Sequence, residues 1–308
     1  MFWNKFFMKG IKVGGLVGLG FLHLACGAPD CSKFSLEQQK NLKKCVYKSL
    51  DRDGRLRQKG IKRFGKVSGK AKTLYENGKL KAVNEYVEGR LHGLSISYYP
   101  NGKVESRVQY KNGRPDGLNQ TFFEVGTISK EYVYKNGLPQ GPYKKLNPKG
   151  ELLEEGQYAE GDLQGLIKIY DNGTLFSEQE YKQGKKAGVY REYYPTGEVS
   201  QVSAWVEGKL TGTVQVFYKS GKLKETYTLD NGLLTGTKSI YEPDGKILAE
   251  ESYMQNQLNG ECKYYKQGVL RQVDFYQDGF MYKRQIYAGE GNLEIEYDYT
   301  GQNSGARP

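Results

Sequence analysis

Residues 95–117 read SISYYPNGKVESRVQYKNGRPDG, and this stretch is the unit that the chain repeats. It contains Gly102, then Gly113 eleven residues later, then Gly117 four residues after that. The same triplet begins again at Gly54, Gly78, Gly126, Gly150, Gly173, Gly197 and Gly221, and less regularly at Gly245 and Gly268. Ten copies with a period of about 24 residues therefore fill residues 46–283, and a fixed period of this length predicts a repeat array.

Each copy has the pattern of a β-hairpin. The first glycine follows Asn, Asp or another turn former, as in Asn101-Gly102, and lies between aromatic and β-branched runs. Pro100 and Pro148 lie two residues before such a glycine, where a two-residue turn would need an N–H group. They favour a three-residue loop with the glycine in the left-handed position. The residue four before the glycine should then lie opposite the residue two after it.

This register predicts one buried face made of three columns. The residues four before the glycine are Leu50, Leu74, Tyr98, Phe122, Leu146, Ile169, Tyr193, Phe217, Tyr241 and Tyr264. Those two after it are Leu56, Leu80, Val104, Ile128, Leu152, Leu175, Val199, Leu223, Ile247 and Leu270. Those eight after it are Lys62, Tyr86, Tyr110, Tyr134, Tyr158, Tyr181, Trp205, Leu229, Tyr253 and Tyr276. Because only Lys62 is polar, we expect all three columns on the core side of the sheet.

The predicted fold is all-β, an elongated antiparallel sheet of tandem hairpins with a short N-terminal helix. Residues 26–45 are expected to form a tether and that helix, because Ser35 to Gln38 has the pattern of a capping box. Residues 46–283 are the repeats. Residues 284–308 are expected to form one more strand, at 293–299, and a disordered tail. The acidic residues that alternate through this strand should discourage edge-to-edge pairing.

Residues 1–25 have the pattern of a secretory signal, with three lysines before a short apolar segment. Cys26 ends this segment after Leu24 and Ala25, which resembles a bacterial lipobox. That resemblance implies that Cys26 is acylated and anchors an exported protein to a membrane of the cell envelope. Its departure is His23, where the family usually has Leu. The alternative is cleavage after Ala28, which would leave a soluble secreted protein.

Two further cysteines bracket the expected helix. In an exported chain Cys31 and Cys45 are candidates for a disulfide, and Cys262 is left as a thiol on the expected core face. The net charge is +11, or +8 without the three lysines of the signal segment. The residues that follow the turn glycines mix both signs, so no basic stripe predicts nucleic-acid binding. A weak attraction to anionic surfaces is compatible with this charge.

The joint motif Tyr-x-Asn-Gly-Lys and Tyr-x-x-Gly-x-x-x-Gly, as in residues 75–93, resembles MORN repeats of the variant found in bacterial YwqK-like proteins. The resemblance covers residues 72–279, and 46–71 more weakly. It implies an elongated sheet of successive hairpins. Some eukaryotic members are associated with membranes and scaffolding, and YwqK-like members are often labelled antitoxins. An exported antitoxin would not meet an intracellular toxin, so that function is disfavoured.

The sequence predicts no enzyme, no cofactor and no metal site. His92 is the one histidine after the signal segment, and other copies replace it with Asp116, Gln140 or Gln164. One histidine cannot complete a catalytic triad or a zinc site of the usual composition. Isolated turn acids lack the several oxygen ligands that calcium needs.

One column is a candidate binding strip. Three residues before the turn glycine, most copies carry a ring, namely Tyr75, Tyr99, Phe123, Tyr170, Tyr194, Tyr218 and Tyr265. These rings are expected to point away from the core face, either to stiffen the sheet through cross-strand contacts or to bind a partner. The favoured function is an envelope-anchored scaffold for a protein or a lipid surface. The alternative is a cell-wall or polysaccharide-binding repeat protein.

Overall fold

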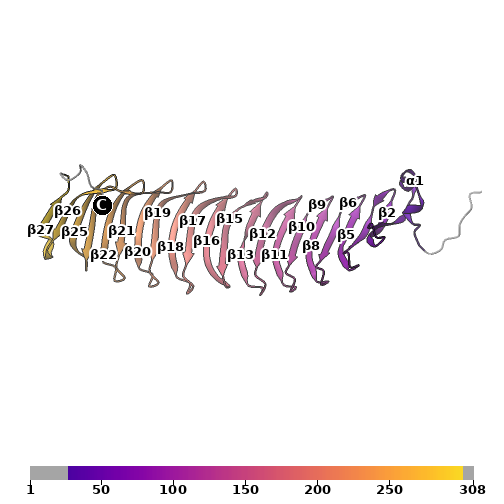
Figure 1. The fold of residues 1–308 in the computed structure, drawn as a ribbon, viewed down its shortest axis with the longest axis horizontal. Coiled ribbons are helices and arrows are strands. Elements are labelled where there is room, and N and C mark those ends of the chain that lie inside the picture. The colour runs from indigo at the N-terminus through magenta and orange to yellow at the C-terminus, as the bar shows by residue number, and fades with distance from the viewer. Residues whose placement is uncertain (1–26, 301–308) are drawn as a thin grey trace, which may run out of the picture.

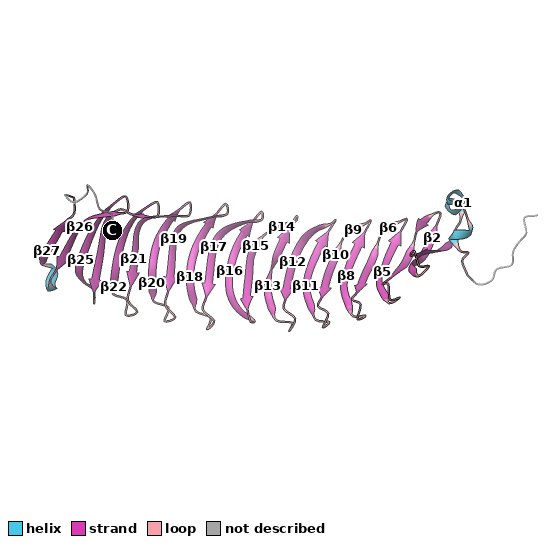
Figure 2. Cartoon of the chain, in the orientation of Figure 1, coloured by secondary structure: helices cyan, strands magenta, loops and turns pink. Residues whose placement is uncertain are grey.

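The computed structural model describes residues 27–300, which form one long antiparallel sheet of successive hairpins (Figure 1). The hairpins follow one another along a single row, from the N-terminal end beside α1 to β27 at the other end. Strands dominate the described chain, and helix is confined to short segments (Figure 2). The prediction of an elongated all-β array is therefore confirmed.

The first half of the described chain contains η1 Cys31–Lys33, α1 Leu36–Asn41, β1 Cys45–Leu50, β2 Leu56–Arg63, β3 Lys66–Val67, β4 Gly69–Leu74, β5 Leu80–Val87, β6 Arg90–Leu91, β7 Gly93–Tyr98, β8 Val104–Lys111, β9 Arg114–Pro115, β10 Gly117–Phe122, β11 Ile128–Lys135, β12 Leu138–Leu146, β13 Leu152–Ala159, β14 Asp162–Leu163 and β15 Gly165–Asp171. The second half contains β16 Thr174–Lys182, β17 Lys185–Tyr193, β18 Val199–Val206, β19 Lys209–Phe217, β20 Leu223–Asp230, β21 Leu233–Tyr241, β22 Ile247–Met254, β23 Gln257–Leu258, β24 Gly260–Lys266, β25 Val269–Gln277, β26 Phe280–Tyr287, η2 Gly289–Gly291 and β27 Leu293–Asp298. Five of the 27 strands (β3, β6, β9, β14 and β23) are two-residue pieces that lead into the next strand, so the chain crosses the sheet 22 times.

Two kinds of turn alternate along the array. In the long turns, such as that around Asn101, Tyr99 N donates to Lys103 O and Gly102 has φ +89°, as a three-residue loop with a left-handed glycine requires. In the short turns, such as Asn112-Gly113, both residues have positive φ, which is the type I′ geometry that suits the twist of two strands. The copies are therefore joined by loops of unequal length at the two edges of the sheet.

The predicted register is observed in eight of the ten long turns. Leu74 lies opposite Leu80, and Tyr98 lies opposite Val104. The register differs in the two copies that are one residue shorter than the others. There the turns Asn172-Gly173 and Gln267-Gly268 have two residues, and Tyr170 and Tyr265 lie opposite Leu175 and Leu270.

The prediction that the three columns share one buried face is wrong, because the third column lies on the other side of the sheet from the first two. Between the pairs Thr73–Ala82 and Leu74–Leu80, Lys81 has no partner, and the other three-residue turns are followed by the same kind of extra residue. This bulge reverses the alternation of the strand that follows. In the eight copies with three-residue turns, the column eight after the glycine therefore lies on the opposite face from the columns four before and two after it.

Side-chain contacts in the middle of the array define the two faces. Tyr143 contacts Tyr158, with ring centroids 4.9 Å apart, and Tyr143 and Lys145 both bond Glu154. We call the side that carries these residues the Tyr143 face. The other side, which carries Leu146 and its partner Leu152, is the Leu146 face. The Tyr143 face holds the most deeply buried side chains of the array, among them Tyr143 at 1% exposure and Val214 at 0%.

An eleventh hairpin, which the glycine spacing did not predict, closes the array. Ala288 N donates to Asn292 O, Gly291 has φ +81°, and Tyr287 lies opposite Leu293. These features repeat those of the other long turns. The predicted last strand is observed as β27, and residues 301–308 lie outside the described part of the chain.

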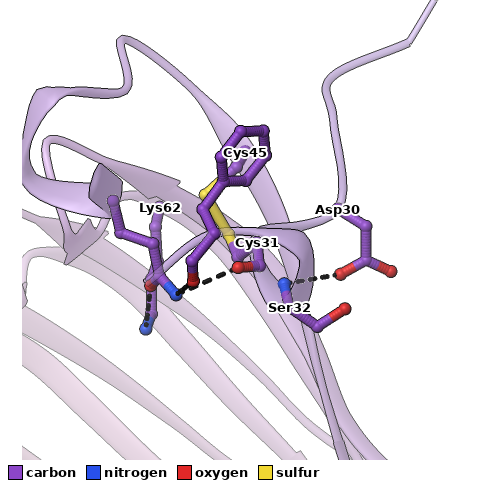
Figure 3. Close-up of a disulfide and its surroundings, with 7 residues drawn as sticks. Asp30, Cys31, Ser32, Cys45 and Lys62 are labelled. Atoms are coloured by element: carbon purple, nitrogen blue, oxygen red, sulfur yellow. Dashed lines mark hydrogen bonds between the residues drawn. A yellow bond between two sulfur atoms is a disulfide. The ribbon is translucent and has the colours of Figure 1, made fainter. Parts of the chain in front are cut away.

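A disulfide links the N-terminal segment to the start of β1 (Figure 3). Ser35 caps α1 in a capping box with Gln38, and the helix ends at Asn41, before the predicted limit at Cys45. Cys31 and Cys45 are joined in a disulfide. Val46 N donates to Pro29 O, so the segment also satisfies part of the free edge of β1.

Candidate binding surface

The candidate strip of rings divides into two groups. Tyr170 and Tyr265 do not belong to it, because the missing turn residue moves them onto the Leu146 face in the place that Tyr98 has elsewhere. There Tyr170 donates to Glu155 and Tyr265 to Glu250. Five rings remain three residues before a long-turn glycine, and they lie on the Tyr143 face. They are Tyr75, Tyr99, Phe123, Tyr194 and Tyr218, and all are partly buried. The prediction that they point away from the more deeply buried side is therefore wrong.

The four tyrosines of this strip each bond the next copy of the repeat. Tyr99 OH donates to Phe122 O at 2.6 Å, and Tyr194 OH donates to Phe217 O at 2.6 Å. Tyr75 and Tyr218 make the same bond, to Tyr98 O at 2.5 Å and Tyr241 O at 2.7 Å. Each bond ties one long turn to the next. The phenol groups are thus engaged within the array, while part of each ring stays accessible.

The lysine of the Tyr-x-Asn-Gly-Lys motif has the same role. Lys79 Nζ donates to Pro100 O at 3.1 Å, and Lys103 Nζ donates to Val125 O at 2.7 Å. Both acceptors belong to the following long turn. The motif therefore encodes two links between neighbouring copies, one from its first residue and one from its last. The sequence contained this signal, but a single copy shows no partner for either side chain.

His92 belongs to a further set of links, at the short turns. Asn112 N donates to His92 Nδ1 at 3.5 Å, and Asn136 N donates to Asp116 Oδ2 at 3.1 Å. Gln140 and Gln164 accept from Glu160 N and Gln183 N in the same way. These side chains share acceptor capacity, which explains why His, Asp and Gln are interchangeable at this position.

The strip is interrupted at the fourth and fifth copies, where a shallow hollow forms. Phe123 lacks the hydroxyl, and Asn147 replaces the ring in the next copy and turns back to bond its own loop. The hollow has a volume of about 740 Å³. It is lined by rings and aliphatic groups together with hydroxyls, including those of Tyr99, Phe123, Leu153, Ser97, Thr121 and Ser129. We call this hollow the Tyr99 groove.

The hydroxyls of the groove are arranged in pairs. Ser97 Oγ and Ser106 Oγ are 2.7 Å apart, and Thr121 Oγ1 and Ser129 Oγ are 2.8 Å apart. Burial, with the nearby carboxylates of Glu105 and Glu124, raises the pKa of Tyr99, so its phenol stays neutral and keeps donating at ordinary pH. The groove thus combines apolar surface and hydroxyl groups with three charged side chains, Glu105, Lys130 and Lys145. Such a surface suits an extended peptide or a sugar.

Among residues 27–300, no group of three or more His, Cys, Asp or Glu side chains is placed to hold a metal ion. Within the same residues, no helix is long and apolar enough to cross a membrane. Cys26, the expected acylation site, lies outside the described residues.

Comparison with known proteins identifies the repeat. Residues 68–88, 91–112 and 210–231 match the model of the MORN repeat variant. The chain thus carries MORN-variant repeats, and repeats of this kind suggest a binding scaffold. No curated protein matches the chain.

The similar solved structures are much larger assemblies. A crystal structure of TcdB2-TccC3-TEV is 13% identical over 80% of this chain and 14% of that chain, with a TM-score of 0.19. The Photorhabdus luminescens Tc holotoxin pore with the TccC3-D651A mutation is 12% identical, over 83% of this chain and 17% of that chain, with a TM-score of 0.18. This chain spans about a seventh of the length of the first of these. At such scores neither structure bears on function.

Proposed function

We propose that this protein is a non-enzymatic repeat scaffold, anchored at its N-terminus to a membrane of the cell envelope, that binds a protein partner along the Tyr143 face. The observation that carries the proposal is the Tyr99 groove. The groove lies beside two successive copies that have Phe123 and Asn147 in place of the strip tyrosine. An accessible aromatic surface beside paired hydroxyls supports binding of an extended segment.

The architecture supports a scaffold rather than a catalyst. The sheet has a single layer, so most side chains on its two faces are only partly buried. A surface of this shape can hold a long partner at several points. The histidine that a catalyst of acyl or phosphoryl transfer would most often use, His92, is instead an acceptor for the next short turn.

Anchoring is the second part of the proposal. Cys26 is proposed to be acylated, which would bring the membrane next to Gly27 and the disulfide-linked segment. Two acyl chains bury enough CH₂ groups for stable attachment. Detergent phase partition of the wild type and of Cys26→Ala tests this part. The wild type is expected in the detergent phase and the variant in the aqueous phase, and a wild type in the aqueous phase would favour cleavage after Ala28.

Crosslinking in intact cells tests the binding surface. A photoreactive residue in place of Phe123 is expected to capture a defined partner. The matched control carries the same residue in place of Val125, which is 60% exposed in the same long turn but does not line the groove. Equal capture from both positions would contradict the groove as the binding site.

Glycan binding remains the second candidate, because rings and hydroxyls also suit sugars. Purified peptidoglycan and soluble glucans should leave the protein in solution if the partner is a protein. Retention on either polymer that is lost in Phe123→Ser would favour the polysaccharide-binding function instead.

A further inference from the structure

The positive charge of the chain is concentrated at its N-terminal end. Residues 27–74 contain 14 Lys and Arg but 4 Asp and Glu, a net charge of +10. Residues 75–300 contain 28 Lys and Arg and 31 Asp and Glu, a net charge of −3. The array is therefore a strongly cationic end joined to a long, nearly neutral body. Composition alone, which gives one overall charge, does not reveal this division.

Part of this charge gathers around one hollow at the N-terminal end. The hollow has a volume of about 820 Å³ and is lined by Gly27, Ala28, Pro29, Leu42, Lys43, Lys44, Arg63 and Phe64. The first short turn lies against the helical segment, because Phe64 N donates to Leu42 O at 2.8 Å and Gly65 lies close to the backbone of Lys40. Two lysines that follow the helix thus meet an arginine and a phenylalanine of the first short turn.

These cations have no acidic partner in the described chain. Lys43, Lys44, Arg63 and Lys66 are exposed, and none of them is within ion-pair distance of a carboxylate of residues 27–300. The row continues along the short-turn edge, where Arg90 and Arg114 follow Lys66 in successive turns. Neighbouring hairpins are about 10 Å apart, so the row of three cations extends over roughly 20 Å.

Phe64 is a second, independent indication that this end of the array contacts a ligand. Its φ is +49°, in the left-handed region that is unfavourable for a bulky side chain. The other short turns place Glu88, Asn112, Asn136, Glu160, Asn172, Gln183, Glu207, Asn231, Gln255, Gln267 or Asp278 in this conformation. Phe64 is nevertheless 59% exposed, so neither the backbone nor the packing of the array explains a ring at this position.

We infer that the N-terminal end, with Lys43, Lys44, Arg63, Lys66 and Phe64 as its contact residues, binds the surface of an anionic phospholipid bilayer. The cations attract the headgroups, and the ring of Phe64 inserts at the level of the interface. A bilayer fits better than an anionic polymer, because a polymer chain offers no apolar layer to an exposed ring. The surface lies outside the three stretches that match the repeat family, and it begins at Gly27. This surface adds a second membrane contact to the proposed acyl anchor. The inference rests on that proposed anchor only for the orientation of the molecule at the membrane.

Vesicle sedimentation with the chain from Gly27 to Pro308 tests the inference without any acyl group. This chain keeps all 27 strands and the disulfide, and its far-ultraviolet circular dichroism confirms folding. Vesicles of phosphatidylcholine that contain phosphatidylglycerol as a minor anionic component should bind it, and binding should weaken as salt is raised. Vesicles of phosphatidylcholine alone should not. Equal binding to both vesicles would overturn the inference.

Two matched variants locate the surface. Replacing Lys43, Lys44, Arg63 and Lys66 with Gln should lower the partition coefficient on anionic vesicles at least about tenfold. Replacing the distal Lys182, Lys209, Lys222 and Lys266 with Gln removes the same charge and should change the coefficient far less. Equal losses in the two variants would show an effect of net charge only, which contradicts a defined surface.

Phe64→Asn gives a test in which folding and binding move in opposite directions. Asn tolerates the left-handed conformation, so the variant should melt at a higher temperature than the wild type. It should nevertheless bind anionic vesicles several-fold more weakly. A variant that is more stable and binds equally well would remove the ring from the surface. Detergent partition of Cys26→Ala is a separate experiment, so failure of acylation and failure of this surface are distinguishable.

Discussion

The two ends of the array differ in how the backbone groups of their edge strands are protected. At the N-terminal end a disulfide-linked segment covers the start of β1, with Val46 N bonded to Pro29 O. At the C-terminal end β27 is an edge strand with every residue exposed, including Leu293, Ile295 and Tyr297. Covering an edge removes its free backbone groups, whereas β27 leaves them accessible between carboxylates.

The difference shows that the stability of each end depends on features close to it. In a repeat array each copy contacts only its neighbours, so an end is stabilised by the features next to it and by little else. The N-terminal end has the disulfide. The C-terminal end has a buried ion pair, in which Arg284 donates to both carboxylate oxygens of Asp274 at 2.7 and 2.8 Å. Asp274 is 2% exposed. Each feature can be removed separately.

The largest effect is expected at the C-terminal ion pair. Arg284→Ala leaves the Asp274 carboxylate buried without its partner, which should cost about 3–5 kcal/mol of unfolding free energy. Chemical denaturation measures the loss. Asp274→Leu with Arg284→Met is the control, because replacing both partners with apolar groups should cost far less. Equal losses in the single and the double variant would mean that packing, and not the unpaired charge, stabilises this end.

Removing the disulfide should have the next largest effect, at the other end. Cys31→Ser with Cys45→Ser opens a loop of about 15 residues and should cost about 3 kcal/mol. Hydrogen exchange should accelerate in β1 and β2 while β25 and β26 keep their protection. Faster exchange along the whole sheet would contradict the nearest-neighbour description and would indicate a single cooperative unit.

High pH should weaken the array through its partly buried tyrosines. Burial, with a hydrogen bond to a neighbouring Glu, raises the pKa to about 12 at each of Tyr170, Tyr193, Tyr253 and Tyr265. The unfolded chain ionises at its ordinary pKa of 10, while the folded chain must keep these phenols neutral. Stability is thus full below pH 10 and falls as the pH rises from 10 to about 12.

Tyr→Phe at these four positions is the control, since it removes the ionisable groups. Over the same pH range, the denaturation midpoint of this variant should change less than that of the wild type. Parallel curves for the two proteins would show that these four phenols do not cause the decline.

The smallest expected effect is on self-association through the free edge of β27. Glu294 and Asp298 lie on β27 and place negative charge along it. Glu294→Val with Asp298→Val should allow two arrays to pair end to end, so light scattering should show a mass that grows with concentration. Lys43→Val with Lys44→Val, at the covered end, is the control and should leave the mass unchanged. Monomers at all concentrations in both variants would show that charge is not what protects the edge.

The sequence predicted the repeat, the hairpins and most long turns, because glycine spacing and the position of proline determine turn geometry locally. It did not predict the bulge after each long turn, since the extra residue, such as Lys81, looks like any other strand residue. For that reason the Tyr110 column was expected on the same face as Tyr98, whereas it shares its face with Tyr99. Tyr170 and Tyr265 were misaligned because the deletion in the two shorter copies was not assigned to the turn.

Part of the candidate surface could not be predicted from the sequence pattern either. A column of tyrosines predicts exposed rings or stacked rings equally well. The bonds from Tyr75, Tyr99, Tyr194 and Tyr218 to the next copy depend on the distance between two long turns, which only the assembled sheet defines. The Tyr99 groove likewise depends on what Phe123 and Asn147 lack relative to their neighbours.

The central claim is that the chain is one continuous array, and small-angle X-ray scattering of residues 27–308 tests it most directly. With 22 crossings of the sheet at about 4.8 Å each, the array should be on the order of 105 Å long. The pair-distance distribution should therefore have an early maximum, set by the width of the sheet, and a long tail that reaches about 100 Å. A symmetric distribution that ends at about 60 Å, as a compact domain of this length would give, would contradict the account.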